Sequence, residues 1–266
     1  MKSILYATDF SENSERALPF ALGLADMHGS ELFMVHILPV ADESSIYKAS
    51  SKMKNLFSSW AKNISTKVHY MVEDHKSQSE GLLRVIDLYS PNLVVVGSKG
   101  GGMIKETIMG STTKTLIRKS KSPVLAVPEN AAYVDFKEVL YTLDYHNANV
   151  PALQTLLKIF QGYEPAITVV HVRDHEEEVE GNLFDYYRDE IQQKIPYPAI
   201  RVKQFFATNI YQELHNHIQQ HKYDLVVMVE KERSNFLDRL FEEDLVQKME
   251  SDLKVPLLSF SEKYLV

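Results

Sequence analysis

The chain has 266 residues, a hydrophobic fraction of 44% and a formal net charge of -7, which allows one large or two ordinary domain cores. Its acidic balance, with a sequence pI of about 5.8, disfavours a broad basic face for duplex DNA or anionic lipid. The absence of cysteine excludes disulfides, thiolate metal sites and cysteine nucleophiles. No apolar run approaches the ~18–20 residues that a membrane helix needs, and no signal-peptide core follows Met1. We therefore expect a cytoplasmic protein that binds neither nucleic acid nor membrane.

The first half of the chain alternates short apolar runs with amphipathic stretches. The apolar runs are rich in β-branched residues without polar alternation, which is typical of buried parallel strands. Strands are predicted at residues 4–7, 32–37, 67–71, 93–96 and 124–127, and helices at residues 11–26, 46–64 and 79–89. Ser11 or Ser14 is the expected N-cap of the first helix. The alternation predicts a doubly wound α/β fold, in which a ligand binds beyond the carboxyl ends of the strands.

The chain also repeats itself. The sequence ILYATDF begins at residue 4, and VLYTLDY begins at residue 139, 135 residues later. At the same offset, FMVHI at residues 33–37 matches TVVHV at residues 168–172. Nearer the end of each half, PNLVVV and SPVLAV match YDLVVM and KVPLLS in the same order. Four matches in order predict two tandem copies of one domain, with the boundary in residues 128–136.

A glycine motif follows the strand predicted at residues 93–96. It reads GSKGGG from Gly97 and GSTT from Gly110, which gives the spacing Gly-x2-Gly-x9-Gly-Ser. Glycines after a strand bring backbone amides close to a ligand with no Cβ in the way. The second part opens a helix, whose free N–H groups and dipole favour a phosphate. The motif is neither a Walker loop nor a dinucleotide fingerprint, because it lacks Gly-Lys-Ser/Thr and follows the fourth strand.

This motif, the opening ILYATDFS, the strand end at residues 35–37 and the closing SPVLAV together resemble the universal stress protein family. Residues 1–130 match over their whole length, and residues 137–266 match as a diverged second copy. The resemblance implies two tandem doubly wound parallel-sheet domains, each a five-stranded sheet with strand order 3-2-1-4-5. It also implies that members with the full glycine motif bind ATP, with Mg²⁺ able to join through the phosphates.

The resemblance assigns roles to individual residues. Asp9 would contact the ribose or the base, and Ile37 would hold adenine through its backbone. The phosphates would be held by Gly97, Ser98, Gly100, Gly110, Ser111 and Thr112. From the residues alone, Asp9 is equally a helix-capping carboxylate, and the two roles can coexist. One departure is the loop at residues 75–77, which reads HKS where the family often has glycine and which borders the expected base pocket.

The second half has lost the motif. Its corresponding stretch reads VEKERS from Val229, and the acidic residues Glu242, Glu243 and Asp244 stand where the phosphate-binding helix would begin. Carboxylates suit a helix N-terminus but repel a triphosphate. We therefore expect the C-terminal domain to bind no ATP and to act as a pseudo-dimer partner. A metal-assisted or different ligand there is the alternative.

Four histidines need an interpretation. His36 and His171 lie inside apolar strands, and each is expected to be a buried neutral side chain with a backbone partner. His217 and His221 have the i, i+4 spacing of a two-histidine metal face. With no third ligand evident, both are expected at the surface, and no metal site is predicted.

Three functions stay open. The first is an ATP-binding stress-response protein that changes its contacts with a protein partner and at most hydrolyses ATP slowly, since no catalytic residue is evident. The second is a nucleotide-free scaffold, and the third is a weak adenine-nucleotide hydrolase. The strands at residues 124–127 and 256–260 are expected to pair as in the family's dimer, and a homodimer of whole chains is left open.

Overall fold

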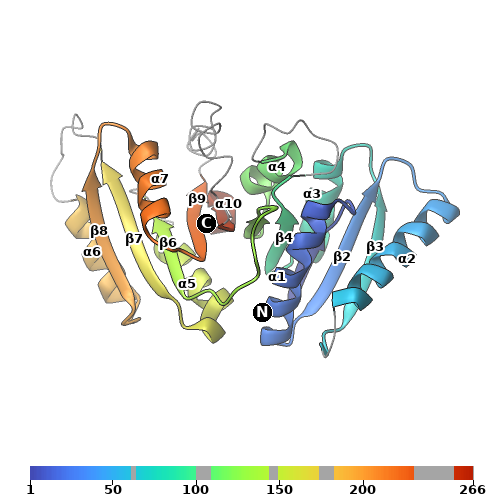
Figure 1. The fold of residues 1–266 in the computed structure, drawn as a ribbon, viewed down its shortest axis with the longest axis horizontal. Helices are drawn as coiled ribbons and strands as arrows, with labels where there is room; N and C mark the ends of the chain where they lie inside the picture. The colour runs from blue at the N-terminus through green and yellow to red at the C-terminus, as the bar shows by residue number, and fades with distance from the viewer. Residues whose placement is uncertain (61–63, 100–108, 144–148, 174–182, 231–254, 266) are drawn as a thin grey trace.

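The computed structural model describes residues 1–266 apart from 61–63, 100–108, 144–148, 174–182, 231–254 and 266 (Figure 1). The first half consists of β1 (Ser3–Ala7), α1 (Glu12–His28), β2 (Glu31–Leu38), α2 (Glu43–Trp60), β3 (Val68–Asp74), α3 (Gln78–Tyr89), β4 (Leu93–Gly97), α4 (Ser111–Lys119) and β5 (Val124–Val127). The second half consists of β6 (Glu138–Thr142), α5 (Asn149–Phe160), η1 (Gln161–Tyr163), β7 (Ala166–Arg173), α6 (Leu183–Lys194), β8 (Ile200–Phe206), α7 (Ile210–Gln220), β9 (Leu225–Glu230), β10 (Leu257–Ser261) and α10 (Glu262–Leu265).

The described strands form one ten-stranded sheet in the order β3-β2-β1-β4-β5-β10-β9-β6-β7-β8. The first half thus has the predicted strand order 3-2-1-4-5, and the second half repeats it as β8-β7-β6-β9-β10. Every pairing within a half is parallel. The predicted α/β fold with doubly wound parallel sheets is therefore confirmed.

The two halves join at the middle of this sheet through one antiparallel pair of strands. Leu257 lies opposite Ala126, Leu258 opposite Leu125, and Ser259 opposite Val124. Both strands are buried, so the junction is part of the core. The predicted approach of residues 124–127 and 256–260 is confirmed, and Figure 1 shows the two halves side by side about this junction.

Helices cover both faces of the sheet. One core contains buried residues of α1, α2, α5 and α6, and the other contains buried residues of α3, α4 and α7. Each core draws on both halves of the chain, so apolar burial, the main stabilising term in folding, couples them. Helix α1 contains the proline Pro19 and ends at Gly29, whose φ of 58° is in the left-handed region that favours glycine.

A second contact between the halves lies on the α1 face of the sheet. At the end of α1, His28 Nε2 donates to the carbonyl oxygen of Ile159 in α5 at 2.7 Å. The connector between the halves buries Phe136 against Phe20 and Phe160. The same connector carries Tyr133, whose hydroxyl is 2.6 Å from that of Tyr163. An aromatic cluster therefore fixes the connector between the two halves.

The structure differs from the sequence-based expectation at His217. This side chain is buried rather than at the surface, and its Nε2 lies 2.8 Å from the hydroxyl oxygen of Tyr223. His217 lies on the face of α7 that packs against the ring of Phe205 in β8, whereas His221 follows the end of the helix and is exposed, with its ring 4.2 Å from that of His217. Within the described ranges, no helix is both long enough and apolar enough to span a bilayer.

Candidate functional site

A cleft lies beyond the carboxyl ends of β1, β2 and β4, between the first turns of α1, α3 and α4. Its volume is about 230 Å³, somewhat below the ~300–1,000 Å³ of typical small-molecule pockets. The lining residues are Ala7, Thr8, Asp9, Ser14, Val35, Ile37, Gln78, Leu82, Val96, Gly97, Lys99, Gly110, Ser111, Thr112 and Thr113.

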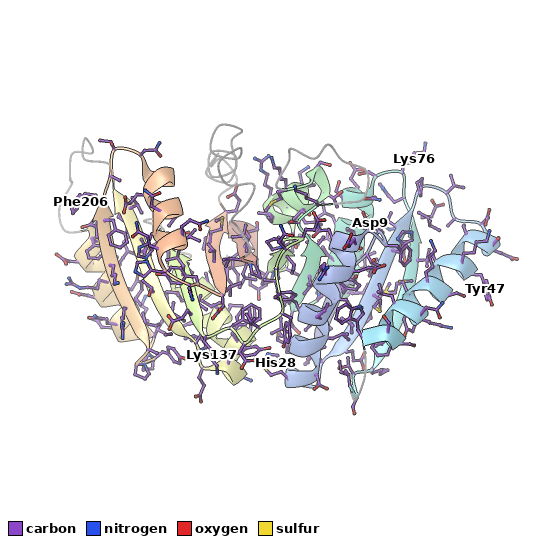
Figure 2. All side chains as sticks on the ribbon, viewed as in Figure 1. Asp9, His28, Tyr47, Lys76, Lys137 and Phe206 are labelled. Atoms are coloured by element: carbon purple, nitrogen blue, oxygen red, sulfur yellow. The ribbon has the colours of Figure 1, made fainter. Side chains whose placement is uncertain are left out.

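Six of the eight residues predicted for the site line this cleft, namely Asp9, Ile37, Gly97, Gly110, Ser111 and Thr112. Ser98 is buried beside it, where its N–H donates to the Val127 carbonyl and its own carbonyl accepts from Gly110. Gly100 lies outside the described residues. The loop at residues 75–77, expected to border the base pocket, contributes no lining residue to the cleft, and Lys76 in it is exposed (Figure 2).

Asp9 lines the cleft and supports the first turn of α1. Its Oδ1 accepts from the Ser11 N–H at 3.0 Å and from the Ser11 hydroxyl at 2.5 Å. Ser11 is the N-cap of α1, and its hydroxyl accepts from the Ser14 N–H at 3.2 Å. The carboxylate therefore orients the capping hydroxyl rather than capping the helix itself. Figure 2 shows Asp9 at the end of the half where β1 enters α1.

Gly97 permits a close contact between β4 and α1. A Cβ at this position would lie 2.8 Å from the Asn13 backbone oxygen. The Asn13 side chain in turn donates from Nδ2 to the Lys99 carbonyl at 2.6 Å. The glycine thus lets the first turn of α1 hold the backbone that follows β4, and that backbone borders the cleft.

One end of the cleft is the N-terminus of α4. Gly110 is its N-cap and makes no side-chain capping hydrogen bond. The first helical hydrogen bond runs from Lys114 N–H to the Gly110 carbonyl, so the N–H groups of Ser111, Thr112 and Thr113 have no acceptor within the helix. No acidic residue lies in the first turn. Three peptide donors and the positive end of the helix dipole therefore face the cleft without an anionic neighbour in their own turn.

The opposite end of the cleft is apolar. Val35 and Ile37 of β2 meet Leu82 of α3 there. The Thr8 N–H donates to the Val35 carbonyl, so the peptide groups of Val35 face β1. Ile37 is two residues further along and directs its peptide groups to the same side, but β1 ends at Ala7, opposite Val35. The backbone of Ile37 is thus placed to offer a donor and an acceptor to a ligand.

The charged groups that line the cleft are Asp9 and Lys99. Behind it, the Tyr6 hydroxyl donates to the Ser14 carbonyl at 2.7 Å, and burial raises the pKa of Tyr6 well above its usual value. Tyr6 therefore stays protonated and serves as a structural donor. In the described part of the chain, no three His, Asp or Glu side chains come together in a group that could hold a metal ion.

Strand register locates the equivalent position in the second half. Val95 pairs with Tyr6, and Val227 pairs with Tyr141, the repeat-equivalent of Tyr6. Two residues further on, Val229 therefore occupies the position of Gly97. The next residue is Glu230, which is buried at the position of Ser98. The acidic stretch at residues 242–244 lies outside the described residues.

The fold and cleft define a class of protein, namely doubly wound α/β proteins with a glycine-lined cleft at the topological switch point. Residues 1–128 match the model of the universal stress protein family. The N-terminal half of the chain is thus a universal stress protein domain. A universal stress protein of Methanocaldococcus jannaschii is 25% identical over 152 residues, which cover 47% of this chain and 94% of the relative.

Solved structures extend the likeness in fold to the whole chain. A universal stress protein from Archaeoglobus fulgidus matches with a TM-score of 0.68 at 16% identity, covering 97% of this chain and 96% of its own. A Pseudomonas aeruginosa protein of unknown function matches with a TM-score of 0.63 at 12% identity, covering 100% and 94%. At these identities the matches establish the tandem fold only, and the function has to be inferred from the geometry of the site.

Proposed function

We propose that the N-terminal half binds ATP, or a closely related adenine nucleotide, and that the protein acts in a stress response by changing its contacts with a protein partner when the nucleotide is bound. In this proposal residues 1–130 form the binding domain and residues 137–266 form a non-binding partner domain. Asp9 is the acidic residue that lines the cleft. A single carboxylate does not form a metal site by itself, so Mg²⁺ would enter bound to the phosphates. The nucleotide is held rather than turned over.

One observation carries the proposal: the cleft has a donor-rich end and an apolar end. The open N-terminus of α4 suits phosphate oxygens. The wall formed by Ile37 and Leu82 suits a flat, weakly polar base, and the peptide groups of Ile37 suit its edge. An adenine nucleotide has this division of character along its length, whereas a purely apolar ligand or a free phosphate would use one end only.

The second half lacks the same complementarity. Val229 carries a side chain where Gly97 has none, and that side chain packs partly buried against the core. Glu230 places a carboxyl group in the position of Ser98. Burial of a carboxylate close to a phosphate is unfavourable because like charges repel more strongly in a low dielectric. We therefore assign one nucleotide site to each chain.

The test is isothermal titration of ATP with Mg²⁺ into the wild type and into Ser111→Glu. Ser111 is the exposed first residue of α4, so the new carboxylate stabilises the helix N-terminus while occupying the phosphate end of the cleft. We expect one site in the wild type and at least a roughly tenfold weaker affinity in the variant, equivalent to about 1.4 kcal/mol. Ser58→Glu adds the same charge at an exposed position of α2 and should bind as the wild type does.

Three outcomes would contradict the proposal. No binding heat in the wild type, together with no nucleotide released from the denatured protein, would leave a scaffold function. Steady-state phosphate release that Ser111→Glu abolishes would show turnover and establish a hydrolase. Equal affinities of Ser111→Glu and Ser58→Glu would place the nucleotide elsewhere on the molecule.

A further inference from the structure

Gln78, the exposed first residue of α3, is one of the residues that line the cleft. Leu82, which also lines the cleft, is four residues later. Residues four apart lie on one face of a helix, so Gln78 and Leu82 present the same side of α3 to the ligand. The side chain of Ser77 caps the N-terminus of this helix, so the side-chain amide of Gln78 is not needed as a cap.

Gly81 fixes the distance between this helix face and β2. A Cβ on Gly81 would lie 3.0 Å from Ile37 Cγ2 and 2.9 Å from His75 Cβ. The absence of a Cβ therefore lets the first turn of α3 rest directly on Ile37. Since Ile37 is the residue whose backbone faces the expected base, the close approach also brings Gln78 to that base.

The polarity of the cleft supports this placement. Its lining charges, Asp9 and Lys99, come from the segments that follow β1 and β4. Gln78 is the uncharged polar side chain that α3 contributes, beside Ile37 and Leu82. Among the described residues, its amide makes no hydrogen bond to the protein. A neutral amide, with a donating NH2 group and an accepting oxygen, is suited to the edge of a heterocyclic base.

We propose that Gln78 reads the edge of the bound base and selects adenine over guanine; this inference rests on the proposed nucleotide site. A glutamine amide pairs with the N6 amino group and N7 of adenine through its oxygen and nitrogen. Guanine presents two acceptors, O6 and N7, at the same edge, so the amide oxygen would face O6 without a donor between them. A site that leaves a polar group unpaired rejects the wrong ligand.

The experiment measures the dissociation constants of ATP and GTP for the wild type, Gln78→Ala and Gln78→Leu, with Mg²⁺. We expect the preference for ATP over GTP to fall about tenfold in both variants, mainly through weaker ATP binding, as one base-reading pair of ~1–3 kcal/mol would give. Glu80→Gln is the matched control, because Glu80 is exposed in the same turn of α3 but does not line the cleft. Its ATP preference should equal that of the wild type.

The outcomes separate this inference from the proposed function. Wild-type binding of ATP with an ATP-to-GTP ratio that stays within twofold in Gln78→Ala and Gln78→Leu would overturn the role of Gln78 and leave the nucleotide site intact. If the wild type binds neither nucleotide, the proposed function fails and the inference fails with it. A loss of preference in Glu80→Gln as large as in Gln78→Ala would assign the effect to the helix turn rather than to the amide.

Discussion

The Nδ1 atom of His36 lies 2.8 Å from the carbonyl oxygen of Thr8, the residue that follows β1. Because a carbonyl oxygen only accepts, Nδ1 carries the proton and donates it to this bond. In the second half, His171 Nδ1 lies 2.9 Å from the carbonyl oxygen of Leu143, again 135 residues later. Both histidines have the backbone partner that the sequence predicted, and His171 is buried as expected, whereas His36 is only half-buried. In the first half this bond holds the turn that leads into Asp9.

Replacing His36 by phenylalanine should affect both stability and nucleotide binding. The phenylalanine ring can still contact Phe10, which lies at a centroid distance of 4.5 Å from the His36 ring, but the Thr8 carbonyl loses its hydrogen-bond donor. We expect a loss of about 1–3 kcal/mol in the free energy of unfolding, measured by urea titration. ATP affinity, measured by titration calorimetry, should fall several-fold because the turn at Asp9 loosens.

The repeat supplies the control for this prediction. His171→Phe removes the equivalent bond from the half that we propose binds no nucleotide, and it should reduce stability by a similar amount while leaving ATP affinity unchanged. Equal effects of His36→Phe and His171→Phe on ATP affinity would show that the turn acts only through global stability.

Replacing Gly97 by alanine should weaken ATP binding indirectly, by disturbing the packing of β4 against α1. In Gly97→Ala the new Cβ would lie 2.8 Å from the Asn13 backbone oxygen, and a backbone atom cannot rotate away as a side chain can. We expect α1 to shift at its first turn, with a cost of about 1–3 kcal/mol in the free energy of unfolding and weaker ATP binding. Val229→Ala, at the equivalent position, removes partly buried methyl groups and should reduce stability without changing ATP affinity. Unchanged ATP affinity in Gly97→Ala would show that the close contact between Gly97 and Asn13 does not support the binding site.

The strands and the tandem parallel-sheet domains could be predicted because their signal is local and repeated: short β-branched runs, alternation with helices and four matches at nearly constant offset. The strand order and the junction of β5 with β10 came instead from the resemblance to the universal stress protein family. The helix bounds differed by a few residues, as at α2, which begins at Glu43 rather than at residue 46. Its apolar face begins later than its first turn, and apolar spacing was the signal used.

The site was only partly predictable because some of its residues depend on how helices dock. Asp9 and Gly110 follow motifs that are visible in the sequence. Gln78 has no such signal, since its direction depends on the contact that Gly81 allows between α3 and Ile37. His217 was placed at the surface for a similar reason. The i, i+4 spacing with His221 gives a helix face, but only packing against Phe205 and Tyr223 shows which residue faces inward.

Stability should fall as the pH is lowered, because of His217. Burial, followed by the neighbouring His221 and Lys203, lowers the pKa of His217 from 6.5 to about 4. Between these values the unfolded chain binds a proton that the folded protein does not, so folding stability is fully present above pH 6.5 and is lost progressively as the pH falls toward 4. The full loss is about 3 kcal/mol for a shift of this size.

The measurement is the midpoint of urea unfolding from pH 7 to pH 4, for the wild type and for His217→Gln. The variant cannot bind the proton, so its stability should depend less on pH across this window, even if it is less stable at pH 7. Parallel curves for the two proteins would assign the acid sensitivity to other groups.

The contact between Gly23 and Tyr133 predicts a mutation whose effect changes sign. A Cβ on Gly23, in the middle of α1, would lie 2.0 Å from the Tyr133 hydroxyl oxygen. Gly23→Ala should therefore displace the Tyr133 ring, break its hydrogen bond to Tyr163 and lower the free energy of unfolding by about 1–3 kcal/mol. With Tyr133→Ala already present, the same change should stabilise the protein by about 0.5–1 kcal/mol, because alanine is the better helix former.

A double-mutant cycle measures this coupling from the urea unfolding of the four proteins. The sign change arises only if the packing of the connector on α1 determines the cost of the alanine. If Gly23→Ala destabilises equally with and without Tyr133, the glycine is needed by α1 itself, and the connector does not fix the two halves through this contact. A change of sign would show that the small residue in α1 is retained for the junction between the halves, although helix propensity alone favours alanine there.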